Sequence, residues 1–102
     1  MNQIVQKCKN VLKNHYQVQF QGLILYGSIA RNTADLSSDI DMLVLLDKPF
    51  DYFQELRKIT DLLYPVQLES EQLISAKPAS VDEFESGRIQ LYRNAKSEGI
   101  AL

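Results

Sequence analysis

The apolar run from Met42 to Leu46 constrains the fold of this chain more than any other feature. Five successive apolar residues leave no polar face, so a strand built from them is covered on both sides. Two acids, Asp39 and Asp41, stand at the beginning of this run. In a strand these acids point to the same face, with their Cα atoms about 6.6 Å apart. The sequence therefore predicts a central strand over residues 39–46 that begins with a pair of carboxylates.

Other segments predict helices and further strands around this one. Apolar residues recur at spacings of three and four in residues 2–15 and again in residues 51–63, which is typical of amphipathic helices. A strand is predicted over residues 21–26, and another over residues 66–69, where Pro65 is expected to end the preceding helix. The remaining predicted elements are a helical turn at 28–32, a polar loop at 32–38, a capped turn at 80–85, a helix at 88–97 and a short strand or tail at 100–102.

Length and composition exclude several classes of protein. The 102 residues fit one modest core, so residues 1–102 are expected to form a single domain. A net charge of −2 argues against direct nucleic-acid binding, because the chain has no excess of Lys and Arg to neutralise phosphates. The single cysteine, Cys8, cannot form an internal disulfide, and no apolar stretch reaches the ~18 residues that span a bilayer. These observations favour a cytoplasmic protein without a membrane segment.

A glycine-serine turn precedes the acid pair. Gly27 and Ser28 follow the predicted strand at residues 21–26, and the backbone N–H groups of such a turn can face a phosphate. Taken alone the turn is weak evidence, because Gly after a strand and Ser as a helix cap are common structural devices. Two acids on one face of an apolar strand are harder to explain structurally, because they repel each other without a cation. Together the motifs predict a phosphate-binding turn beside a magnesium site.

These residues resemble the signature of the minimal nucleotidyltransferases, members of the DNA polymerase β superfamily. That signature is Gly-Ser, a gap of ten residues, and then Asp-x-Asp, and it matches the segments Leu25–Arg31 and Ser38–Val44. The resemblance implies an α/β (α+β) nucleotidyltransferase fold, in which helices flank a small mixed sheet. It also implies a magnesium-dependent enzyme that transfers a nucleotide, usually AMP from ATP, to an acceptor hydroxyl.

The resemblance also implies a role for each motif residue. Gly27 and Ser28 would hold the β- and γ-phosphates, and Asp39 and Asp41 would hold the metal ions. Such acids agree with chemistry in which two metals about 3.5–4 Å apart clamp the attacking and leaving oxygens. Arg31 matches an arginine of the family and would face phosphate or form a salt bridge to a loop carboxylate.

The third carboxylate of the family normally lies on the next strand, which the sequence predicts over residues 66–69. With Glu69 in that position, the metal-binding and catalytic set would be Asp39, Asp41 and Glu69. With Gln67 there, the chain would lack a metal ligand and the group expected to accept the proton of the acceptor. We take Glu69 as the third carboxylate and keep Gln67 as the alternative occupant.

The resemblance further implies a protein partner. Minimal nucleotidyltransferases are commonly paired with a helical HEPN protein, typically a toxin, and serve as its antitoxin. About 100 residues leave little chain for an acceptor pocket, so acceptor specificity is expected to come from that partner. The alternative is a weak or inactive member of the fold that neutralises its partner by binding alone. Both hypotheses allow homo- or hetero-oligomers.

Overall fold

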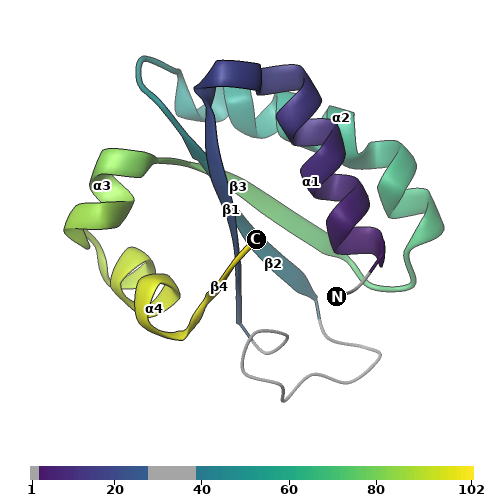
Figure 1. Ribbon diagram of the computed structural model, residues 1–102. Coiled ribbons are helices and arrows are strands. Elements are labelled where there is room, and N and C mark those ends of the chain that lie inside the picture. Colours follow the sequence, from purple (N-terminus) through teal and green to yellow (C-terminus); the bar gives the residue numbers. More distant parts are fainter. Residues whose placement is uncertain (1–2, 28–38) are drawn as a thin grey trace.

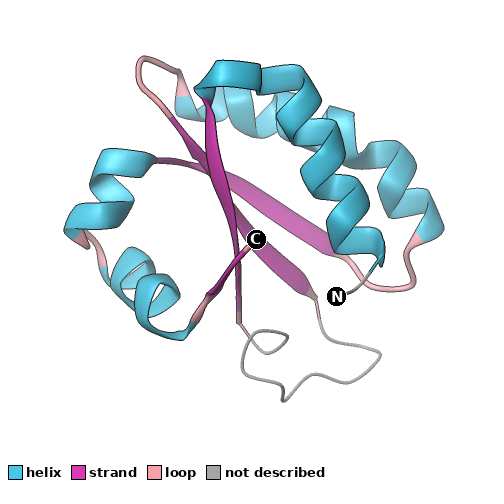
Figure 2. Cartoon of the chain, in the orientation of Figure 1, coloured by secondary structure: helices cyan, strands magenta, loops and turns pink. Residues whose placement is uncertain are grey.

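The protein is a four-stranded sheet with helices on both faces (Figures 1 and 2). The computed structural model describes residues 3–27 and 39–102. In chain order the elements are α1 (Gln3–Tyr16), the 3₁₀ helix η1 (Gln17–Gln19), β1 (Phe20–Tyr26), β2 (Ile40–Leu46), α2 (Tyr52–Glu69), β3 (Ile74–Ser80), α3 (Val81–Ser86), α4 (Gln90–Glu98) and β4 (Ile100–Ala101). The strand order is β3-β2-β1-β4, with β2 and β3 parallel and the other neighbours antiparallel. This mixed sheet confirms the α/β fold class.

Strand β2 lies inside the sheet and is covered on both faces, as its apolar run predicted. Alternate residues Ile40, Met42, Val44 and Leu46 pack with α1 and α2 on one face. Leu43 and Leu45 pack with α3 and α4 on the other. Figure 1 shows these two helical layers on opposite sides of the strands. The side chain of Asp41 has the same alternation as Leu43 and therefore faces the α3–α4 side.

Most predicted elements are confirmed within a few residues. The two amphipathic stripes form α1 and the beginning of α2, and the acid Asp51 caps α2 by accepting a hydrogen bond from the backbone N–H of Gln54. Ser80 caps α3 in the same way, and the predicted last helix is α4. The predicted turn at 28–32 and loop at 32–38 lie outside the described residues.

The prediction that Pro65 ends the helix and that residues 66–69 form a strand was wrong. Helix α2 continues through Pro65 to Glu69. A proline inside a helix leaves the carbonyl four residues earlier without its N–H partner. Pro65 lies on the exposed side of α2, where water can serve that carbonyl, while Leu63 and Val66 are buried in the core on either side of it. Burial of this continued apolar stripe outweighs the local effect of the proline.

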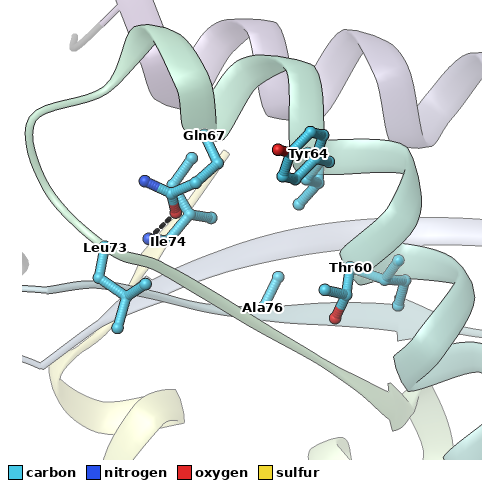
Figure 3. Close-up of a pocket in the computed structure, with 8 residues that line it drawn as sticks. Thr60, Tyr64, Gln67, Leu73, Ile74 and Ala76 are labelled. Atoms are coloured by element: carbon cyan, nitrogen blue, oxygen red, sulfur yellow. Dashed lines mark hydrogen bonds between the residues drawn. The ribbon is translucent and has the colours of Figure 1, made fainter.

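The third strand is β3, which begins after α2 and pairs with β2 at the edge of the sheet. The backbone N–H of Ile40 donates to the carbonyl of Leu73, so in the parallel ladder the N–H of Ile74 points away from β2. The side-chain Oε1 of Gln67 accepts from that N–H at 2.7 Å (Figure 3). The Nε2 of Gln67 donates to the carbonyl of Gln72. Farther along β3, Pro78 has no backbone N–H, so no donor is left unpaired at that position of the sheet edge. Gln67 therefore protects the edge of the sheet rather than standing at a catalytic position.

We expect Gln67→Leu to lower the free energy of unfolding by about 1–2 kcal/mol, because the N–H of Ile74 loses its acceptor in a partly buried place, whereas the carbonyl of Gln72 still accepts from the hydroxyl of Ser70. Urea denaturation measures the difference. Gln6→Leu is the matched control, since its side chain donates to Asn10 on the exposed face of α1. A Gln67→Leu protein as stable as the control would contradict the role assigned to this side chain.

Candidate functional site

The turn after β1 and the beginning of β2 lie against each other. Tyr26 pairs with Asp41 across the antiparallel ladder, and Gly27 follows with a φ of +78°, a conformation that L residues rarely adopt. A Cβ atom on Gly27 would lie only 2.7 Å from Oδ2 of Asp41. Only glycine therefore allows the backbone to turn this close to the carboxylate. The structure brings the predicted turn and the predicted acid together, while Ser28 and Arg31 lie outside the described residues.

Asp39 and Asp41 form a closely spaced pair of carboxylates. Strand β2 begins at Ile40, one residue later than predicted, so Asp39 is exposed just before the strand and Asp41 is partly buried within it. Burial raises the pKa of Asp41, the negative charge of Asp39 raises it further, and the ammonium of Lys77 acts in the opposite direction. Two repelling carboxylate groups beside a close backbone turn fit a divalent cation, because oxygen ligands of this kind are those that Mg²⁺ prefers.

Glu69, predicted as the third carboxylate, does not join this pair. It is the last residue of α2, and its exposed carboxylate lies 3.0 Å from Nζ of Lys7 in α1. Helices α1 and α2 cover the face of the sheet opposite to the side chain of Asp41. The placement of Glu69 was wrong because α2 extends past Pro65. Gln67, its alternative, belongs to the same helix and caps Ile74.

The strand beside β2 carries no acid. Ser75 of β3 pairs with Asp41, and Lys77 pairs with Leu43, so both side chains share the face of Asp41. Within residues 3–27 and 39–102, no group of three or more His, Cys, Asp or Glu side chains is placed to hold a metal ion. The described part of the site is thus a carboxylate pair flanked by a serine and a lysine.

Three tyrosines also gather on this face, although their positions on separate elements gave no common spacing in the sequence. Burial raises the pKa of Tyr26, and the charge of Asp41 and the phenol of Tyr52 raise it further. Burial likewise raises the pKa of Tyr92, with contributions from Glu83 and again Tyr52. The phenol of Tyr52, at the beginning of α2, therefore lies within electrostatic reach of both Tyr26 and Tyr92. Only the tertiary fold reveals this cluster.

The groove between α2 and β3 in Figure 3 is a separate feature. It has a volume of about 160 Å³ and is lined largely by apolar side chains, among them Leu63, Leu73 and Ala76. Ligand pockets usually enclose about 300 Å³ or more. This groove lies on the α2 side of the sheet, away from Asp41, so it is not a place for a nucleotide.

Among the described helices, none has the length and apolar character that crossing a membrane requires.

We expect Glu69→Gln to leave the affinity for Mg²⁺ and ATP unchanged, because its carboxylate lies on the opposite face of the sheet from Asp41. The loss of its exposed ion pair to Lys7 is expected to change the free energy of unfolding by less than about 1 kcal/mol. Calorimetric titration and urea denaturation measure the two quantities. A large loss of nucleotide affinity in Glu69→Gln would contradict this placement and indicate that Glu69 belongs to the nucleotide site.

Comparison with known proteins agrees with this fold. The chain is 39% identical over 72 residues to MJ0604 of Methanocaldococcus jannaschii, which is named as a candidate protein adenylyltransferase; the match covers 67% of this chain and 72% of the relative. A crystal structure described as a candidate nucleotidyltransferase from Sulfolobus solfataricus superimposes with a TM-score of 0.65 at 13% identity, over 97% of this chain and 76% of that one.

Two solved toxin–antitoxin structures share the fold as well. A mutant of the pair MntA–HpeT superimposes with a TM-score of 0.62 at 18% identity, over 100% of this chain and 72% of that one. A toxin–antitoxin with AMP-PNP gives a TM-score of 0.54 at 18% identity, over 94% and 70%. Residues 6–102 match the family model for "Polymerase beta, Nucleotidyltransferase". The chain, with its turn at Gly27 against the acid of β2, therefore belongs to the polymerase β nucleotidyltransferase family.

Proposed function

We propose that this chain, as a single domain, binds ATP with Mg²⁺ at Asp39 and Asp41 and transfers AMP to a hydroxyl group on a partner protein. The observation that carries this proposal is the contact between the turn and the acid, since a Cβ on Gly27 would stand 2.7 Å from the carboxylate of Asp41. An AMP-PNP-bound structural neighbour and a relative named as a candidate protein adenylyltransferase support the choice of nucleotide and acceptor.

The residues of the chain contribute positioning and charge. The left-handed backbone at Gly27 lets the turn approach Asp41, so a triphosphate held at the turn reaches the carboxylate pair. Asp39 and Asp41 would hold the metal, which when bound neutralises phosphate charge and orients the reacting groups. Preorganised charge of this kind lowers the barrier because nothing has to reorganise during reaction.

The reaction exchanges one phosphorus–oxygen bond for another. The hydroxyl oxygen of the acceptor bonds to the α-phosphorus, and the bond from that phosphorus to the bridging oxygen of the β-phosphate breaks. Pyrophosphate leaves, and the proton of the hydroxyl passes to solvent. With Ser75 rather than an acid opposite Asp41, no described carboxylate on β3 is available to take this proton.

We assign the acceptor to a HEPN-type toxin, with this chain as its antitoxin. The two toxin–antitoxin structures that share the fold support a protein partner. The small size of the chain supports the same idea, because the described residues leave little besides the carboxylate pair to select an acceptor. The unpaired thiol of Cys8 is compatible with a reducing compartment, and we assign the pair to the cytoplasm.

Radiolabel transfer tests the proposal. The purified chain is incubated with its HEPN-type partner, Mg²⁺ and ATP labelled at the α-phosphate, and label on the partner is measured. We expect label on the partner with the unaltered chain and none with Asp41→Ala. Absence of label with the unaltered chain would contradict AMP transfer.

Neutralisation by contact alone is the second candidate function, and the absence of an acid from β3 beside Asp41 favours it. The same experiment separates the two candidates when inhibition of the toxin is measured in parallel. Inhibition that persists in Asp41→Ala, without label transfer by either protein, supports contact alone. Inhibition lost together with label transfer supports catalysis.

A further inference from the structure

Lys77 occupies a distinctive place beside the acid pair. It lies on β3, one strand over from Asp41, and its position two residues beyond Ser75 puts its side chain on the same face of the sheet. A lysine side chain is long enough to reach back from this diagonal position toward the beginning of β2. The influence of its ammonium on the carboxylate of Asp41 is consistent with that reach. Lys77 forms no ion pair within 4.0 Å with another described residue.

The strand order determines where Lys77 lies relative to a nucleotide bound at the turn. Strand β2 lies between β1 and β3, so the turn at Gly27 is on one side of Asp41 and Lys77 is on the other. A triphosphate whose outer phosphates were held at the turn, as the proposed function has it, would have room to extend across Asp41 toward β3. In that orientation its α-phosphate, where the acceptor attacks, would be the phosphate nearest to Lys77.

We propose that Lys77 binds the α-phosphate of the nucleotide and supplies, on β3, positive charge where the family resemblance implied a third carboxylate. The inference rests on the proposed function and deepens it. During transfer the acceptor oxygen bonds to the α-phosphorus and pyrophosphate departs with the bridging oxygen, while Lys77 stays protonated. Its ammonium interacts with the non-bridging oxygens of the α-phosphate, whose charge it offsets as the bonds exchange.

Binding of two phosphate ligands tests this inference without relying on turnover. The unaltered chain and Lys77→Ala are each titrated calorimetrically with ATP and with pyrophosphate in the presence of Mg²⁺. We expect Lys77→Ala to weaken ATP binding about tenfold, the size of one lost charge-assisted contact, and to leave pyrophosphate binding unchanged. Lys77→Arg is expected to retain most of the ATP affinity, because it keeps the charge.

Lys48→Ala is the matched control, since this lysine is held by Glu83 of α3 at 2.8 Å. Its ATP and pyrophosphate affinities should match those of the unaltered chain. Equal ATP affinity in the unaltered chain and Lys77→Ala would overturn the inference and leave the proposed function standing. An equal loss for ATP and pyrophosphate would also overturn it, because Lys77 would then face the outer phosphates. Failure of the unaltered chain to bind ATP with Mg²⁺ would overturn the proposed function and this inference together.

Discussion

Gly27→Ala is expected to reduce the affinity for ATP and Mg²⁺ by at least about 100-fold, because the added methyl group and the carboxylate of Asp41 cannot occupy the same space. At 2.7 Å the Cβ would overlap Oδ2, so either the turn or the acid must move. The φ of +78° adds backbone strain, which for Ala in place of Gly costs about 1 kcal/mol of folding free energy. Calorimetric titration gives the affinity, and urea denaturation gives the stability.

Gly87→Ala is the control variant that distinguishes the effect of backbone strain from loss of the nucleotide site. Gly87 caps α3 with a φ of +65°, so alanine there suffers similar backbone strain. Its Cβ would also crowd a neighbouring side chain, with Cγ of Arg93 only 2.9 Å away, but that neighbour is not one of the site acids. This variant should lose stability and keep its affinity for ATP. If Gly27→Ala also kept its affinity, the close approach of turn and acid would have no part in nucleotide binding.

Asp41→Asn is expected to weaken the binding of ATP and Mg²⁺ about 100-fold, because an amide of nearly the same shape has no negative charge to offer a cation. The folded protein without ligand should be at least as stable as the unaltered chain at neutral pH. The raised pKa of Asp41 means that folding disfavours its ionised form, and Asn removes that penalty. Thermal denaturation with and without ATP and Mg²⁺ measures both effects.

Asp82→Asn serves as the control for Asp41→Asn. Asp82 is an exposed acid in the first turn of α3, and its loss should leave the stabilisation by ATP intact. A large fall in the stability of Asp41→Asn without ligand would show that the carboxylate has a structural role. Full stabilisation of that variant by ATP and Mg²⁺ would remove Asp41 from the proposed metal site.

The central strand and the acid pair could be predicted because their signals are local. Five apolar residues in a row require a covered strand, and β2 is covered on both faces. The turn at Gly27 could also be predicted locally, because a glycine directly after a strand is a common signal for a turn. These features depend on residues near one another in the sequence.

The continuation of α2 and the identity of β3 could not be predicted in this way. Proline usually marks the end of a helix. At Pro65 the burial of Val66 against the core outweighs this local signal, and α2 continues. The segment Ile74–Ser80 contains a lysine and a proline and little apolar alternation, so only its pairing with β2 defines it as a strand. The misplacement of Glu69 and the unrecognised position of Lys77 both follow from these two errors.

The most direct test of the magnesium–nucleotide site is a calorimetric titration of the unaltered chain with ATP, performed once with Mg²⁺ and once with EDTA. In the proposed function, the carboxylate pair at the beginning of β2 would repel a bare triphosphate and would bind one through a cation. We therefore expect binding at a single site with Mg²⁺ and no measurable binding in EDTA. Equal binding under both conditions, or no binding with Mg²⁺, would contradict the assignment of Asp39 and Asp41.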